Sequence, residues 1–467
     1  MAQHGFPDGF LWGAATSAQQ IEGGRHEGAR GESIWDCFAS IPGNIEDGST
    51  PDIACDHYHR WREDIDLMKG LGLGGYRFSI AWPRILPAGR GQVNGAGLDF
   101  YDALVDGLLA AGIQPFPTLY HWDLPQALQN RGGWGERDTA EAFVEYSAAV
   151  TRRLGDRVSQ WVTHNEPWCA ATLGYQDGHH APGVRDPAAA LRAAHHLLLS
   201  HGWATDTIRR EAPGAEVGIV LIHCPAHAAS NSEADRDAAR WFDGFFNRWY
   251  LDPVYRGSYP ADAIADRVAA GQLKEPDLPF VKDGDLAAIS SPLDFLGLNY
   301  YSRAVMKAGP DNKPMDAKTV PSDELTDMGW EVYPQGLQES LLRVHREYEP
   351  QKIYIAENGA AFDYPVDAEG RIADTKRVSY LREHLLAAHR AIADGVPLAG
   401  YFTWSLMDNF EWGYGYKKKF GLFAVDFATQ ERSPKDSALW YRDVVAANAV
   451  EDASAPTSQG EFRAFDP

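Results

Sequence analysis

The segment Ile353-Tyr354-Ile355-Ala356-Glu357-Asn358-Gly359 joins a short apolar run to a glutamate and a glycine. A second segment, Trp161-Val162-Thr163-His164-Asn165-Glu166-Pro167, has the same form. Short apolar runs of this kind are typical of parallel strands that are buried on both faces. Pro167 lacks a backbone donor and Gly359 frees φ, so each strand is predicted to end beside its glutamate.

Similar runs recur along the whole chain. The predicted strands are residues 10–15, 75–80, 114–119, 161–164, 217–222, 295–299, 353–356 and 398–403. Amphipathic helices are predicted between them, for example where Tyr58, Trp61, Ile65 and Met68 recur at steps of three and four. A second helix carries apolar residues from Val378 to Ile392 and is capped by Gly395. Further helical stretches are predicted at residues 98–111, 140–154, 188–210, 234–250, 336–348 and 437–446.

Eight strands that are each followed by a helix predict an α/β fold, a single (β/α)₈ TIM barrel with long loops on its C-terminal face. A doubly wound open sheet is the alternative that this alternation leaves open. We expect one catalytic barrel over residues 1–450 and a polar C-terminal tail over residues 451–467. The Pro-containing stretch 308–327 lies between a strand and its helix and is expected to be an elaborate loop on the catalytic face.

Composition excludes several classes of function. The formal net charge of -22 disfavours nucleic acid and anionic membrane surfaces as partners. The four cysteines form no CxxC pair and are expected to be reduced thiols. The first ten residues show no signal-peptide pattern, and no apolar run approaches the roughly 20 residues of a membrane span. We therefore expect a cytoplasmic protein; a homo-oligomer is compatible with the sequence.

Two motifs resemble cofactor or metal sites but lack the required context. Gly70, Gly72 and Gly75 have the spacing of a dinucleotide fingerprint, yet they close a helix and open a strand, which is the reverse order. The pairs His179/His180 and His195/His196 have no acidic or cysteine partner at metal-ligand spacing. We expect neither a metal nor a cofactor.

The two glutamates at strand ends carry the chemical prediction. On a barrel both would lie on the C-terminal face, where such enzymes hold their reacting groups. Glycoside hydrolysis uses one protonated and one ionised carboxyl group on opposite sides of an anomeric carbon, about 5–5.5 Å apart when configuration is retained. A salt-bridged rim residue is the alternative for either glutamate alone.

Seven segments make the chain similar to glycoside hydrolase family 1, the β-glucosidase family. They are FLWGAATS (10–17), YRFSI (76–80), LYHWDLP (119–125), THNEP (163–167), LNYY (298–301), AENG (356–359) and WSLMDNFEW (404–412). The resemblance implies that Glu166 is the acid/base and Glu357 the nucleophile, with Arg77 and Tyr301 contacting the nucleophile. Sugar-contacting residues implied by the resemblance are Gln20, His121, Trp122, Asn165, Asn299, Tyr301, Trp404, Glu411, Trp412 and Phe420; Trp168 and Trp330 are assigned to the aglycone side.

The implied activity is retaining hydrolysis of terminal non-reducing β-D-glucosyl residues from O-glycosides and short oligosaccharides such as cellobiose, with β-galactosides or β-fucosides also accepted. Family members that act on 6-phosphoglycosides have a small residue where this chain has Glu411, so the resemblance favours a sugar without phosphate. Two alternatives remain, an enzyme that mainly transfers the glycosyl group to other acceptors and a non-catalytic sugar-binding relative.

Overall fold

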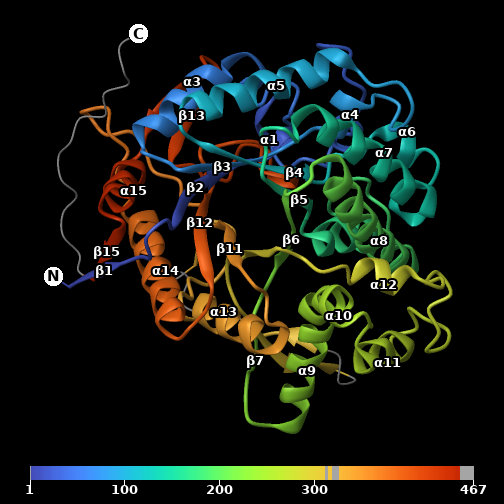
Figure 1. Ribbon diagram of the computed structural model, residues 1–467. Coiled ribbons are helices and arrows are strands. Elements are labelled where there is room, and N and C mark those ends of the chain that lie inside the picture. Colours follow the sequence, from blue (N-terminus) through green and yellow to red (C-terminus); the bar gives the residue numbers. More distant parts are fainter. Residues whose placement is uncertain (1, 311–313, 318–324, 453–467) are drawn as a thin grey trace.

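The computed structural model describes residues 2–310, 314–317 and 325–452. Within these ranges eight parallel strands close into one barrel in the order β11-β12-β2-β3-β4-β5-β6-β8 (Figure 1). The strands are β2 (Leu11–Ala15), β3 (Gly75–Ser79), β4 (Gln114–Tyr120), β5 (Gln160–Asn165), β6 (Glu216–Ile222), β8 (Phe295–Asn299), β11 (Ile353–Asn358) and β12 (Leu398–Trp404). Each overlaps a predicted strand, so the barrel is confirmed and the open sheet is wrong.

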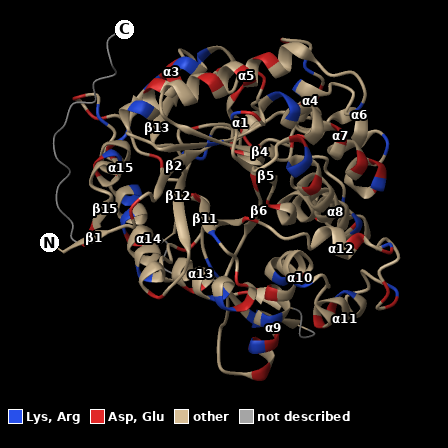
Figure 2. Ribbon diagram, in the orientation of Figure 1, with Lys and Arg blue, Asp and Glu red and all other residues tan. Residues whose placement is uncertain are grey.

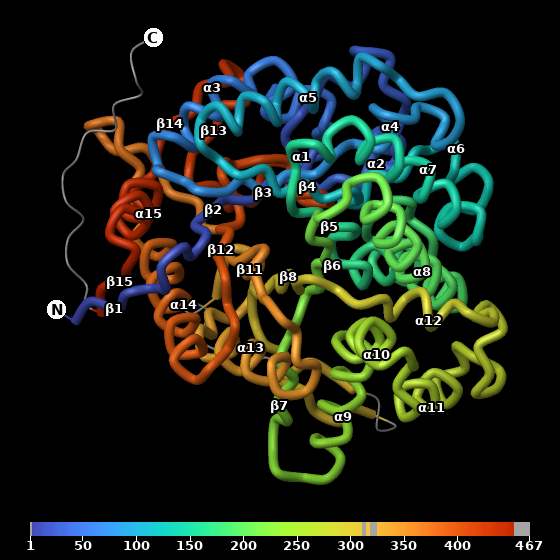
Figure 3. Tube along the Cα trace, viewed as in Figure 1, coloured from blue at the N-terminus to red at the C-terminus, as the bar shows by residue number. Residues whose placement is uncertain are grey.

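Helices surround the barrel, as Figures 1 and 3 show. The main ones are α3 (His57–Gly70), α5 (Gly95–Ala110), α7 (Arg137–Leu154), α8 (Pro187–Glu211), α13 (Gln335–Tyr348), α14 (Thr375–Ala393) and α15 (Asp436–Ala447). Lys, Arg, Asp and Glu residues of both charge signs are spread over the outer helices (Figure 2). Gly395 follows α14 with φ of 95°, a conformation that glycine adopts without strain. No helix in the described part of the chain is both apolar and long enough to traverse a bilayer.

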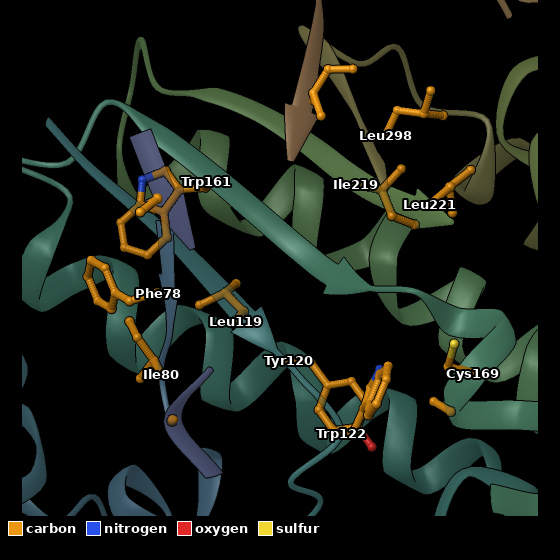
Figure 4. Close-up of a cluster of buried hydrophobic side chains, with 14 of the residues drawn as sticks. Phe78, Ile80, Leu119, Tyr120, Trp122, Trp161, Cys169, Ile219, Leu221 and Leu298 are labelled. Carbon is orange, nitrogen blue, oxygen red and sulfur yellow. The ribbon is translucent and has the colours of Figure 1, made fainter. Parts of the chain in front are cut away.

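The period of two along each strand separates an inner core from an outer core. Inside the barrel, the ring of Phe116 lies 5.3 Å from Phe295, 5.2 Å from Tyr354 and 5.1 Å from Phe402 between centroids. These aromatic rings fill the barrel interior below the polar ends of the strands. Residues of opposite parity pack outward against the helices, among them Leu119, Trp161, Ile219 and Leu221 (Figure 4).

The helical stretch predicted over residues 234–250 is confirmed, but it is not one regular α-helix. That stretch is α9 (Glu233–Asp243), a π-helix η3 (Gly244–Arg248) and then α10 (Trp249–Arg256). The amide of Trp249 donates to the carbonyl of Gly244, five residues earlier. This wider turn inserts a residue and rotates the aromatic side chains that follow α9, which a regular period of 3.6 cannot anticipate.

Long connections after β6 and β8 carry a small sheet that the sequence did not predict. Its strands are β7 (Ala226–Ala228), β9 (Ala304–Ala308) and β10 (Pro314–Asp316), in the order β10-β9-β7. The predicted loop 308–327 therefore contains part of this sheet, and its residues 311–313 and 318–324 lie outside the described residues.

The predicted tail 451–467 falls mostly on residues 453–467, which also lie outside the described part. Its first residue belongs to β15 (Ala449–Glu451), which pairs antiparallel with β1 (Gln3–Gly5). The two ends of the described chain therefore lie side by side (Figure 3).

The packing of α5 against α4 (Trp82–Ile85) gives a test of the fold. A Cβ at Gly97 would lie 2.1 Å from the carbonyl oxygen of Arg84, whereas one at Gly95 would meet nothing within 4 Å. Gly97→Ala is expected to lower the free energy of unfolding by about 1–3 kcal/mol through overpacking. Gly95→Ala, on the same helix, is expected to leave it unchanged or raise it slightly. Denaturant unfolding of both variants measures the difference; equal stability of the two would contradict this packing.

Candidate active site

The carboxyl ends of the barrel strands open into a cavity of about 880 Å³. Its wall includes residues that end or follow five different strands, namely His121, Glu166, Tyr301, Glu357 and Trp404. This is the end of a barrel at which the loops, rather than the packed core, determine what is bound. The sequence therefore places its chemically distinctive residues around one hollow.

Glu166 and Glu357 both line this cavity, and their residues are 4% and 3% exposed. Glu166 follows β5 directly and has φ of 45°, a left-handed conformation that is unfavourable for a side chain of this size. Its amide donates to the carbonyl of Val220 on β6 at 2.9 Å, which fixes this turn. Glu357 lies within β11 and is held by the barrel itself.

Arg77 on β3 is fully buried and organises the polar centre of the site. Its Nη1 donates to Glu357 Oε1 at 2.6 Å, and its Nη2 donates to Asn165 Oδ1 at 2.6 Å. The hydroxyl of Tyr301 donates to the other oxygen of Glu357, Oε2, at 2.5 Å. A guanidinium therefore contacts one oxygen of Glu357 and a phenol contacts the other.

The arginine side chain can only donate hydrogen bonds, so Arg77 determines which atoms donate and which accept in the hydrogen bonds of its neighbours Asn165 and His121. Because Asn165 Oδ1 accepts from Arg77, Asn165 Nδ2 must be the donor to His121 Nε2, at 3.1 Å. The proton of the His121 ring then lies on Nδ1, for which the described residues offer no partner. Burial, reinforced by the charge of Arg77, holds the pKa of His121 well below its ordinary value and keeps the ring neutral.

Glu166 is held differently from Glu357. Its Oε1 accepts from Asn299 Nδ2 at 2.8 Å, and its Oε2 accepts from the thiol of Cys169 at 3.2 Å. Burial, and after it the negative charge of Glu357, raises the pKa of Glu166 above its ordinary value. The cavity therefore has one carboxyl group with a raised pKa, Glu166, and another that pairs with a cation, Glu357.

Glu411 is a third carboxyl group in the cavity wall. Burial, together with the charges of Glu357 and Glu166, raises its pKa to about 8. Gln20 lies behind it and does not line the cavity: its Nε2 is 3.0 Å from Asn409 Oδ1, 2.9 Å from the carbonyl of Phe410 and 3.4 Å from Glu411 Oε2. Gln20 therefore orients the loop that carries Glu411.

Aromatic rings form the remaining walls. The ring of Trp412 lies 4.6 Å from Trp122 and 5.9 Å from His121 between centroids. Trp122 and Trp412 have φ of 77° and 48°, so both adopt the left-handed conformation seen at Glu166. Three bulky residues in this conformation around one cavity mark a site whose geometry is imposed by its surroundings.

The structure brings the predicted residues together, with some in the wall and others behind it. In the wall are His121, Trp122, Glu166, Trp168, Tyr301, Trp330, Glu357, Trp404, Glu411, Trp412 and Phe420. Behind it, buried, are Gln20, Arg77, Asn165 and Asn299.

Sequence reasoning missed other wall residues, including Cys169, Leu173, Phe246 and Arg303. Cys169 and Leu173 follow Glu166 by three and seven residues, a helical spacing that would have found them. Phe246 could not be placed without the π-helix η3, in which its ring packs 4.2 Å from that of Trp168.

The histidine pairs have different surroundings. His179 and His180 line the cavity, whereas His195 and His196 are buried in α8. Among the residues that the structure describes, no cluster of three His, Cys, Asp or Glu side chains is arranged to hold a metal ion.

Comparison with known proteins gives consistent matches. A family model described as Glycosyl hydrolase family 1 matches residues 2–450. Beta-glucosidase A of Acetivibrio thermocellus is 48% identical over 452 residues, which are 96% of this chain and 100% of that protein. A bifunctional beta-D-glucosidase/beta-D-fucosidase of Bifidobacterium breve is 44% identical over 471 residues, 95% of this chain and 99% of that protein. The solved family 1 β-glucosidase from Thermotoga maritima has a TM-score of 0.92 at 46% identity and covers 97% of this chain and 100% of its own.

The charge of Glu357 offers a direct test of the electrostatics. Glu357→Gln keeps the size of the side chain and removes the negative neighbour of Glu166, so the ionised form of Glu166 becomes easier to reach. The pKa of Glu166 is expected to fall by about one unit or more and to stay above the ordinary value because burial persists. ¹³C NMR titration of labelled glutamate carboxyls measures it, with the signal assigned by its loss in Glu166→Gln. Glu411→Gln should lower the pKa of Glu166 less than Glu357→Gln does. An unchanged pKa of Glu166 in Glu357→Gln would contradict the effect of the Glu357 charge on Glu166.

Proposed function

The chain belongs to glycosyl hydrolase family 1 and is a glycoside hydrolase; on this premise we propose that it is a retaining β-glucosidase, with Glu357 as nucleophile and Glu166 as acid/base. The observation that carries the proposal is the pair of buried carboxyl groups in one cavity, of which one is held by a cation and the other has a pKa raised by its surroundings. Retaining hydrolysis needs this division of roles.

In the first step Glu357 attacks the anomeric carbon while Glu166 donates its proton to the leaving oxygen. Arg77 and Tyr301 occupy both oxygens of Glu357 and aim the carboxylate at the sugar. The C–O bond to the aglycone breaks, the aglycone leaves as an alcohol, and an ester forms between Glu357 and the sugar.

In the second step the ester has no charge, so Glu166 loses its nearest negative neighbour. Its pKa falls, and the ionised Glu166 can take a proton from water as that water attacks the anomeric carbon. Cleavage of the ester restores the charge of Glu357 and, through it, the protonated form of Glu166. Each step thus prepares the protonation state that the next one requires.

We assign sugar recognition to the polar and aromatic groups around this pair. Asn165 lies behind the wall, and on the family resemblance we assign its second amide hydrogen, beyond the one bonded to His121, to the 2-hydroxyl of the sugar. This bond would strengthen in the transition state. His121 and Glu411 also line the cavity, and we assign them to further hydroxyls of the sugar. Trp122, Trp404, Trp412 and Phe420 provide apolar faces for the ring, while Gln20 and Asn299 act through Glu411 and Glu166.

We further propose terminal, non-phosphorylated β-D-glucosides as substrates, including cellobiose released from cellulose. The carboxylate of Glu357, together with Glu166 and Glu411 whenever these are ionised, would repel a phosphate in the cavity. The name of the Bifidobacterium breve relative supports β-fucosides as additional substrates, and β-galactosides are proposed on the family resemblance. Trp168 and Trp330 are assigned to the aglycone. The non-catalytic and the mainly transglycosylating alternatives are not favoured, because the relatives are named for hydrolysis.

Removal of the nucleophile tests the proposal. Glu357→Gly is expected to reduce hydrolysis of aryl β-glucosides by at least about 10⁴-fold, because no glycosyl ester can form. With an aryl β-glucoside as substrate, added azide should occupy the space left by the Glu357 side chain. It should attack the anomeric carbon from that side and give the α-glucosyl azide. NMR of the product reads the anomeric configuration. Formation of the β-azide would assign the nucleophile to another residue.

Removal of the acid/base gives the complementary result. Glu166→Ala is expected to slow hydrolysis of unactivated glucosides by about 10²–10⁴-fold. Glucosides with strongly acidic leaving groups should still glycosylate Glu357, because such groups depart without a proton. Azide should then attack the ester and give the β-glucosyl azide. Undiminished hydrolysis of cellobiose by this variant, measured as released glucose, would exclude Glu166 as the proton donor.

A further inference from the structure

The thiol of Cys169 contacts the carboxyl group to which the acid/base role is assigned. Cys169 follows Glu166 by three residues, and its amide donates to the Glu166 carbonyl at 2.9 Å. It begins the π-helix η2 (Cys169–Gln176), whose first turn directs its side chain back toward Glu166. The sulfur lies 3.2 Å from Glu166 Oε2, and Cys169 is part of the cavity wall.

The two oxygens of Glu166 have partners of different kinds. Oε1 faces the amide nitrogen of Asn299, which also donates to Asn165 Oδ1 at 3.1 Å. Because Asn165 Oδ1 and Glu166 Oε1 are both acceptors, Asn299 must present its NH₂ to them and cannot accept a proton there. A proton on Glu166 therefore belongs on Oε2, the oxygen that faces the thiol.

A thiol suits that position because its hydrogen can rotate and its sulfur is a weak acceptor. When Glu166 is ionised, the S–H can donate to Oε2. When Oε2 carries the proton, the S–H can turn away and leave the hydroxyl free to point into the cavity. Burial and the charge of Glu166 raise the pKa of the Cys169 thiol well above its ordinary value, so it keeps its hydrogen throughout.

We propose that Cys169 is a positioning residue for the proton transfer, an inference that rests on the proposed function. Its thiol holds the ionised carboxylate of Glu166 through Oε2 and releases that oxygen when it carries the proton for the leaving group. The other charged or titratable groups that face Glu166 are Glu357 on β11, Arg77 on β3, Tyr301 after β8 and Glu411 after β12. None of these is altered by a change at Cys169.

The alkaline limb of the kcat/KM profile tests this, since it follows loss of the Glu166 proton in the free enzyme. Cys169→Ala and Cys169→Val cannot stabilise the ionised form, so their limb should move to higher pH by about half a unit. Cys169→Ser keeps a hydroxyl donor, and its limb should stay at or below the wild-type position. Valine is close to cysteine in volume, so it separates loss of the donor from creation of a cavity. Cys37→Ala, outside the cavity wall, should leave the profile unchanged.

A second measurement makes its main observation on the wild-type enzyme. The S–H stretching band of Cys169 in the wild-type enzyme, assigned by its loss in Cys169→Ser, should shift to lower frequency as Glu166 ionises. In Glu166→Gln the band should not respond to pH. A common alkaline limb for the serine, alanine and valine variants, or a band that ignores the titration, would overturn the inference. Failure of the proposed function would appear instead as retained hydrolysis in Glu166→Ala, so the two failures are distinguishable.

Discussion

The site depends on one buried ion pair, between Arg77 and Glu357. Removing a guanidinium from water is costly, and only excellent geometry offsets that cost. Here Arg77 lies 3.2 Å or less from acceptors on three other strands, namely Thr118 Oγ1 on β4, Asn165 Oδ1 on β5, and Glu357 Oε1 and the Ala356 carbonyl on β11. Since every one of these bonds must run outward from Arg77, one residue determines the amide orientation of Asn165 and, through it, the tautomer of His121.

Such a centre requires a closed barrel. In register, Arg77 pairs with Ala15 on β2 and with Phe116 on β4, so the guanidinium reaches the strand ends from within the wall. The ring cluster around Phe116 closes the interior below, while the cavity opens above. The polar groups are thereby confined to a low-dielectric layer in which charges act strongly on each other. This explains why the charge of Glu357 contributes to the raised pKa of Glu166.

Most of the barrel could be predicted from the sequence because its strands are apolar on both faces and end at residues such as Pro167 or Gly359 that stop a strand. Glu166 and Glu357 could be predicted as a pair because the ends of parallel strands share one face. The π-helices η2 and η3 could not be predicted, because a π-turn adds a residue to a helix without changing the helix's composition. The contact of Phe246 with Trp168 was missed for that reason, whereas the spacing of Cys169 from Glu166 would have indicated its position. The position of Gln20 behind Glu411 also depends on loop geometry that no period in the sequence encodes.

The same arrangement favours a neutral, hydroxyl-rich ligand. Glu166, Glu357 and Glu411 surround the cavity, and of the three only Glu357 pairs with a cation, Arg77, among the ion pairs of the described residues. Repulsion between the three is relieved partly by protonation, as the raised pKa values of Glu166 and Glu411 indicate. A sugar supplies several hydroxyl donors to these acceptors without adding charge, whereas an anionic ligand would add to the repulsion. The carboxyl groups of the cavity thus favour an uncharged sugar over an anionic ligand.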